Sequence, residues 1–109
     1  MCPGGQLPKR LPALLALVAC CAAAQQTVVV SIQDYRFVPA EVRIKAGDTV
    51  QWTNREKRTS HAVLFPAENG LESERLFPQE HWQRTFAQPG SYGYRCGPHE
   101  EMQGVVIVE

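Results

Sequence analysis

A thiol, an imidazole and a thioether lie within seven residues near the C-terminus, at Cys96, His99 and Met102. At this C-x2-H-x2-M spacing, one tight loop can turn all three side chains toward a single point. His61, which precedes the apolar residues 63–65, is the candidate for a further ligand. Two imidazoles, a thiolate and a weak axial thioether are the donors of blue-copper sites. These four residues therefore predict one bound copper ion.

The loop also has a less specific interpretation, as a turn with a buried Cys96, a surface His99 and a core Met102. A C-x2-H pair alone would favour that interpretation. The position of Met102 and the presence of His61 upstream favour the metal. His81 is left over, and we expect it to be a surface residue of a strand rather than a fifth ligand or part of a second copper site.

The first 24 residues have the pattern of an export signal. Lys9 and Arg10 precede an apolar run over 11–19, and Ala22-Ala23-Ala24 provides a cleavage site. The run is too short for a membrane-spanning helix. We therefore expect a signal peptide at 1–24, a mature domain at 25–109 and export to a bacterial periplasm. Leu17-Val18-Ala19-Cys20 also resembles a lipobox, which would anchor the protein to the membrane at Cys20; we favour plain secretion, because few residues separate Cys20 from the first expected strand.

Export changes the meaning of the four cysteines. Cys2, Cys20 and Cys21 fall in the expected signal peptide, so the mature domain keeps Cys96 alone. A single thiol in an oxidising compartment is reactive unless something binds it, and a metal would do so. The sequence has no C-x-x-C-H haem motif, no G-x-G-x-x-G and no P-loop.

Charge and length exclude some classes of protein. The whole chain has 11 basic and 11 acidic residues, and removal of Lys9 and Arg10 leaves 9 basic residues against 11 acidic ones. Such a mildly acidic domain is a poor candidate for binding nucleic acid. Residues 25–109 suffice for one domain with a modest core, so a bound metal should contribute to its stability. We expect a monomer.

Short alternating segments separated by polar turns predict an all-β chain. We expect strands at 27–32, 37–39, 41–45, 49–53, 61–65, 81–86, 91–96 and 105–108, with a polar loop and a possible helical turn at 66–74. Seven or eight such strands predict a two-sheet sandwich. Arg84 interrupts the apolar face of its strand, and only an edge position would suit it.

The mature chain resembles the cupredoxins over residues 25–109. Besides His61, the resemblance rests on Phe37-x-Pro39, Ala46-Gly47-Asp48-Thr49-Val50-x-Trp52-x-Asn54, Pro89-Gly90-x-Tyr92-x-Tyr94-x-Cys96 and Cys96-x-Pro98-His99-x-x-Met102-x-Gly104. The two-residue gap between His99 and Met102 is similar to the amicyanin branch, whereas plastocyanins and pseudoazurins have four residues there. The resemblance implies a Greek-key β-sandwich and one type 1 copper that alternates between Cu(II) and Cu(I). It implies the ligands His61, Cys96, His99 and Met102.

The resemblance also implies a role without bond chemistry, namely electron transfer between periplasmic redox proteins such as a c-type cytochrome and a dehydrogenase or reductase. A copper carrier or sequestering protein could use the same ligands. An enzyme subunit of the multicopper oxidase or nitrite reductase type would need an interdomain copper site, which this short chain lacks. A metal-free adhesion sandwich is the most distant alternative.

Two positions depart from the cupredoxin pattern. Many relatives have Asn where this chain has Ala62, and amicyanin-like loops have Thr where it has Gly97. Both changes remove side chains that hold the ligands by hydrogen bonds; Ser60 or Thr59 could replace them.

Other expectations concern the surface at the site. We expect His61 to be buried and His99, beside Pro98, to face solvent and the partner. Glu100 and Glu101 are either solvated carboxylates or an electron-exit surface for a basic partner. Residues 55–58 could dock a partner too, although a solvated loop is the default interpretation.

Overall fold

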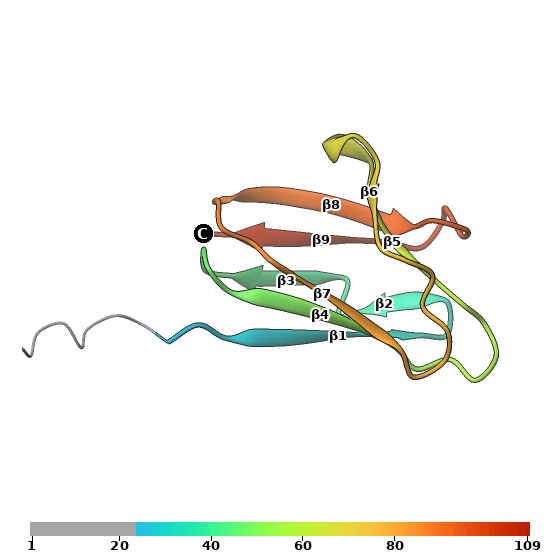
Figure 1. Cartoon of the computed structure of the whole chain (residues 1–109). Coiled ribbons are helices and arrows are strands. Elements are labelled where there is room, and N and C mark those ends of the chain that lie inside the picture. Colours follow the sequence, from blue (N-terminus) through green and yellow to red (C-terminus); the bar gives the residue numbers. More distant parts are fainter. Residues whose placement is uncertain (1–23) are drawn as a thin grey trace, which may run out of the picture.

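Two β-sheets lie face to face in the computed structural model, which describes residues 24–109 (Figure 1). Nearly all of the expected signal peptide, including Cys20, lies outside the described residues. Within the described part of the chain, no helix has the length and apolar character needed to cross a membrane.

The described residues contain nine strands and one 3-10 turn. They are β1 Thr27–Gln33, β2 Arg36–Val38, β3 Glu41–Ile44, β4 Thr49–Asn54, β5 Val63–Phe65, η2 Pro66–Glu68, β6 Leu71–Glu72, β7 His81–Thr85, β8 Gly90–Cys96 and β9 Gln103–Val108. The first sheet has the order β2-β1-β4-β7, and the second has the order β3-β9-β8-β5-β6. β1 pairs in parallel with β4, and β3 pairs in parallel with β9. The two-sheet sandwich predicted from the sequence is confirmed.

Alternation along the strands forms the core between the sheets. Val30 of β1 lies beside Trp52 of β4, and both are fully buried. Trp52 packs edge-on against Tyr94 of β8, with ring centroids 5.2 Å apart, and against Phe65 of β5, at 6.1 Å. The indole of Trp52 therefore links the two sheets, and such edge-to-face contacts add to the free energy of burial.

Two local expectations need correction or completion. His61 does not lie in a strand: it makes a single bridge with Leu76, and β5 begins only at Val63. The two backbone hydrogen bonds of this bridge, one donated and one accepted by His61, fix the residue although no longer strand pairing forms. The segment 66–74 contains the expected helical turn as η2, but it also contains the short strand β6, which pairs with β5.

Arg84, the charge in an apolar pattern, lies on the edge strand β7. Its guanidinium donates hydrogen bonds to both carboxylate oxygens of Glu68, at 2.8 and 2.7 Å. The guanidinium carbon lies 4.5 Å from the ring centroids of Phe65 and Phe86, and 5.3 Å from that of Tyr92. The side chain thus covers the aromatic edge of the core while its charge is paired.

The connections that carry the candidate ligands lie at one end of the sandwich. The β4–β5 connection bears His61. The end of β8 bears Cys96, and the following β8–β9 loop bears His99 and Met102; the β1–β2 turn is close to both connections (Figure 1). The strands therefore act as a rigid frame for a site built from loops.

Candidate metal centre

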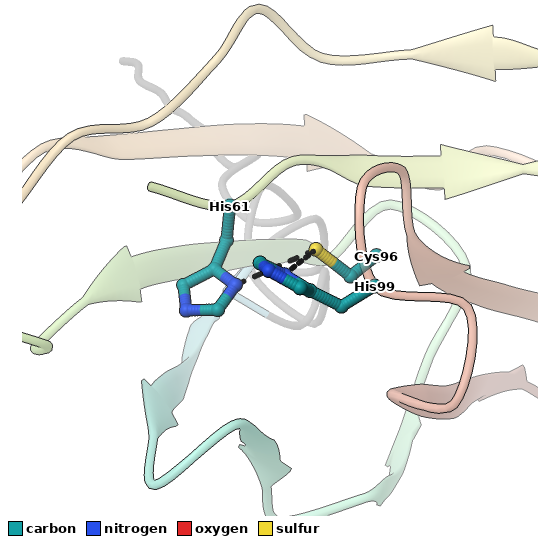
Figure 2. A group of neighbouring side chains, drawn as sticks. All are labelled: His61, Cys96 and His99. Carbon is teal, nitrogen blue, oxygen red and sulfur yellow. Dashed lines mark hydrogen bonds between the residues drawn. The ribbon is translucent and has the colours of Figure 1, made fainter. Parts of the chain in front are cut away.

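Three of the four predicted ligands converge. Nδ1 of His61 lies 3.4 Å from Sγ of Cys96, and Nδ1 of His99 lies 3.5 Å from the same sulfur (Figure 2). The three donor atoms all lie within 4.8 Å of one another. Both imidazoles turn the same nitrogen toward the sulfur, so a single cation between them could contact all three atoms.

Backbone hydrogen bonds close the loop that carries Cys96, His99 and Met102. The N–H of Cys96 donates to the carbonyl of Met102 at 3.0 Å, and the N–H of Met102 donates to the carbonyl of His99 at 3.0 Å. Cys96 is the last residue of β8, and β9 begins directly after Met102. The Met102 side chain is buried, with 2% of its surface exposed. The structure therefore holds the predicted C-x2-H-x2-M segment as one tight hairpin loop.

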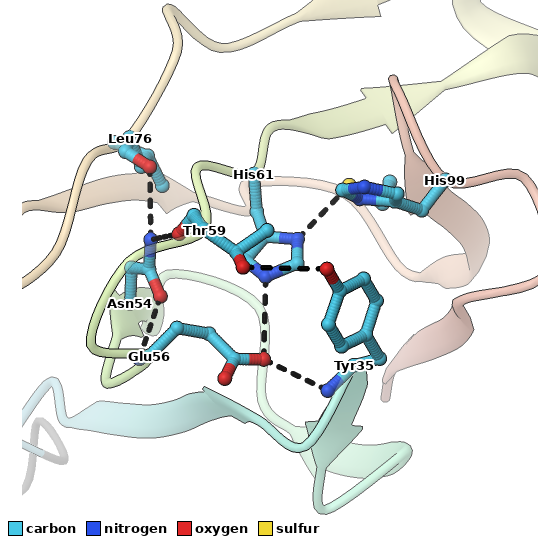
Figure 3. Close-up of polar contacts among 8 residues, drawn as sticks. Tyr35, Asn54, Glu56, Thr59, His61, Leu76 and His99 are labelled. Carbon is cyan, nitrogen blue, oxygen red and sulfur yellow. Dashed lines mark hydrogen bonds and ion pairs between the residues drawn. The ribbon is translucent and has the colours of Figure 1, made fainter.

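A buried asparagine holds the His61 segment. Nδ2 of Asn54 donates to the carbonyl oxygens of Thr59, at 2.8 Å, and Leu76, at 2.9 Å (Figure 3). His61 and Leu76 exchange backbone hydrogen bonds of 3.0 and 2.7 Å. Asn54 thus holds both the segment that precedes His61 and the residue that pairs with His61, which explains why an amide side chain is fully buried here.

The two histidines differ in exposure as expected. His61 is fully buried, whereas His99 is partly exposed in the loop. His81 is exposed on β7 and does not belong to the cluster formed by the other two histidines and Cys96. Only His99 therefore offers a route from the cluster to the surface.

Tyr35 and Glu56 adjoin the cluster, and neither was predicted from the sequence to contact the ligands. Asp34 and Tyr35 form the two-residue turn between β1 and β2, and both have a positive φ, 55° and 58°. The Tyr35 ring lies edge-on to the imidazoles of His61 and His99, with centroid distances of 5.6 and 5.0 Å. Its backbone N–H donates to Oε2 of Glu56 at 2.8 Å.

Glu56 in turn faces the outer nitrogen of His61. Its Oε2 lies 3.4 Å from Nε2 of His61, within ion-pair distance but without the alignment of a hydrogen bond (Figure 3). Within the segment 55–58, Glu56 therefore faces the site, while Arg55, Lys57 and Arg58 are exposed. No spacing in the sequence relates Tyr35 to Glu56, because only folding brings their loops together.

Burial sets the protonation of the donors. Burial raises the pKa of the Cys96 thiol, although the backbone N–H groups of Ala62 and His99 oppose this shift. Burial lowers the pKa of His61, and the Glu56 carboxylate opposes that shift. Burial therefore favours the neutral form of His61, which is the form that binds a metal, and it favours the thiol form of Cys96, whose proton a bound metal ion would replace.

The two departures at Ala62 and Gly97 leave a backbone link between the ligand segments. The N–H of Gly97 donates to the carbonyl of Ala62 at 3.4 Å. The hydroxyls expected as substitutes are engaged elsewhere: Ser60 accepts from Arg75 at 3.1 Å, and Thr59 lies 3.3 Å from the Tyr35 hydroxyl.

The donors fit copper better than other common metals. One sulfur and two imidazole nitrogens are soft and borderline ligands, whereas calcium and magnesium require oxygen. A closed structural zinc site would have four strong ligands of cysteine or histidine, and here three such side chains converge within the described residues. A β-sandwich with this donor set at one end defines the class of blue copper proteins.

Comparison with known proteins gives the same assignment. The family of copper-binding proteins described as plastocyanin/azurin matches residues 24–109. The chain belongs to this family. It is 41% identical over 86 residues to amicyanin of Paracoccus versutus, a match that covers 75% of this chain and 64% of that protein. It is 38% identical over 85 residues to the chloroplastic plastocyanin of Tetradesmus obliquus, covering 67% of this chain and 58% of that protein.

Solved structures of amicyanin share the fold. The crystal structure of Paracoccus versutus amicyanin superposes with a TM-score of 0.73 at 39% identity, covering 84% of this chain and 88% of that one. A Cu(I) form of an amicyanin variant gives a TM-score of 0.73 at 36% identity, covering 84% and 89%. The cofactor that the family implies is a single type 1 copper.

Proposed function

We propose that this protein is a single-copper electron carrier and not an enzyme, with His61, Cys96, His99 and Met102 as the ligands. The observation that carries this proposal is the convergence of two imidazole nitrogens on the buried Cys96 sulfur. Membership in a family that contains amicyanin and plastocyanin supports it.

Copper, when bound, supplies one-electron exchange between Cu(II) and Cu(I). The chain's contribution is to hold the donors in nearly one geometry for both states. Asn54 fixes the His61 backbone, and the hydrogen bonds between the ends of the 96–102 loop fix the other ligands. Little then has to move when an electron arrives. The partly exposed His99 is the proposed site of electron entry and exit.

The proposed partner is another redox protein, such as a c-type cytochrome or a periplasmic dehydrogenase or reductase. Glu100 and Glu101 follow His99 directly, and both are exposed. Negative charge beside the exit residue would attract a basic partner and raise the rate of association more than the affinity.

The proposed location is the periplasm, with residues 1–24 as the signal peptide and 25–109 as the mature domain. Support comes from the sequence: two basic residues, an apolar run and a small-residue cleavage site. Intact-mass measurement of the exported protein tests this. A chain that begins at Gln25 supports secretion, whereas a lipid-modified chain that begins at Cys20 would show the lipobox to be used.

Addition of Cu(II) to the purified apo-protein tests the copper site. We expect an intense blue thiolate-to-copper absorption band and the electron paramagnetic resonance spectrum of a type 1 site. Cys96→Ser should abolish the band, while His81→Gln, a control at the spare histidine, should keep it. A wild-type spectrum of weak, tetragonal copper would contradict the proposal.

A second measurement separates electron transfer from copper transport. An electron carrier should cycle reversibly between its two redox states without losing copper. Rapid transfer of Cu(I) to an apo-acceptor protein would instead favour the copper carrier.

A further inference from the structure

The glycine at position 97, directly after the cysteine, lies against the end of the exposed Glu72 side chain. Gly97 is not among the glycines with positive φ, so its backbone could accommodate any residue. A Cβ at this position would overlap Oε2 of Glu72 and lie 3.2 Å from its Cδ. It would meet the Ala62 Cβ only at 3.5 Å, an ordinary contact. The Glu72 carboxylate thus occupies the space that a larger residue 97 would fill.

Strand pairing explains how Glu72 comes to lie there. Leu64 of β5 pairs with Glu72 of β6 on one side and with Arg95 of β8 on the other. Glu72 and Arg95 therefore flank Leu64 in one row across the sheet. Ser73 keeps β6 in register, since it exchanges hydrogen bonds of 2.9 Å with the backbone of Val63.

Arg95 contacts the same peptide from its own strand. Its Nη1 donates to the carbonyl oxygens of Cys96, at 2.9 Å, and Gly97, at 3.2 Å. The guanidinium of Arg95 thus holds the residue after the thiol by its carbonyl, while the exposed end of the Glu72 side chain lies beside the α-carbon of that residue.

We propose that Arg95 is a positioning residue that clamps the ligand loop through the carbonyls of Cys96 and Gly97, and that the Glu72 carboxylate beside Gly97 lowers the reduction potential of the bound copper. Because residue 97 is a glycine, the carboxylate has room there. The electrostatic half of the inference rests on the proposed copper function. A carboxylate beside the residue that follows Cys96 favours the more positive Cu(II) state, by a factor of roughly 2–10 in the ratio of oxidised to reduced protein.

Reduction potentials of copper-loaded variants test the role of Glu72. Glu72→Gln should change the ratio of oxidised to reduced protein by that factor and so raise the reduction potential. At about 59 mV per tenfold change in the ratio, the rise is at most about 59 mV. Gly97→Ala should raise it by a similar amount, because the new methyl group displaces the flexible carboxylate. The double variant should shift no further than the larger single shift, since both changes remove the same contact.

Glu74→Gln is the matched control, because it removes the same charge from an exposed residue two positions away. The inference is overturned if Glu72→Gln shifts the potential no more than Glu74→Gln does. Additive shifts of Glu72→Gln and Gly97→Ala would overturn it too, because they would show that the carboxylate does not occupy the space at residue 97.

The clamp can also be tested without copper. In the apo-protein, Arg95→Met should speed hydrogen exchange at the amides of Gly97 and Met102, and Arg95→Lys should restore part of the protection. Unchanged exchange in Arg95→Met would refute the role of Arg95. This result is independent of metal binding, so a failure of the clamp and a failure of the copper proposal give different outcomes.

Discussion

Replacement of Arg84 should destabilise the apo-protein although the residue lies on an edge strand. Its side chain is 19% exposed, and that of its partner Glu68 is 34% exposed. The ion pair should therefore contribute about 1 kcal/mol rather than the larger value of a buried pair. Contacts of the guanidinium with the rings of Phe65, Phe86 and Tyr92 should add about 1 kcal/mol in total, because one cation cannot interact fully with three rings.

We therefore expect Arg84→Ala to lower the free energy of unfolding by about 2 kcal/mol, or the melting temperature by roughly 8–16 °C for a domain of this size. Arg84→Met should lose only about half as much, since its apolar chain still covers the rings. Denaturant unfolding of the apo-protein measures both. Arg36→Ala, at an exposed arginine of β2, is the control and should change stability by less than about 0.5 kcal/mol.

Acid gives an independent test of the same pair. The hydrogen bonds that the Glu68 carboxylate accepts from Arg84 lower the pKa of Glu68 below its usual value of 4.5. The stabilisation is therefore present above pH 4.5 and is lost as the pH falls through the lower, folded-state value. The destabilisation caused by Arg84→Met should shrink as Glu68 becomes protonated. A melting temperature of Arg84→Ala within about 4 °C of the wild type at neutral pH would refute the reasoning.

Other predictions concern the copper end of the molecule. Copper at 1,000 times its dissociation constant should stabilise the fold by about 4 kcal/mol, seen as a large rise in melting temperature; an unchanged melt would indicate adventitious binding. Asn54→Ala should cost about 2–4 kcal/mol in denaturant unfolding, because it removes the hydrogen bonds that the buried amide donates to the carbonyls of Thr59 and Leu76, and should broaden the copper spectrum. Glu100→Gln with Glu101→Gln should slow electron transfer to a basic cytochrome at low ionic strength and raise the potential slightly. That rate difference should vanish at high salt, and a wild-type rate in dilute buffer would exclude acidic docking.

The sequence was informative where one local pattern carries the constraint. Alternation identified the strands, because the period of two is a property of each strand alone. The loop from Cys96 to Met102 could be anticipated for a similar reason, since its residues share one hairpin. The strand assignment of His61 failed because its partner, Leu76, lies in a distant irregular segment that shows no alternation.

The surroundings of the site were harder to predict, because they depend on contacts between loops. Tyr35 reaches both imidazoles only because a left-handed turn directs it there, and Glu56 reaches His61 only because Asn54 bends the chain after β4. For Arg84, the edge position on a strand was predicted from the sequence, but its ion-pair partner Glu68 was not. In each case the partner of a charged or polar side chain is set by the folded path of the backbone rather than by a local pattern in the sequence. Residue types and spacing can thus indicate which donors meet the metal, while the side chains that tune those donors depend on how the loops pack in three dimensions.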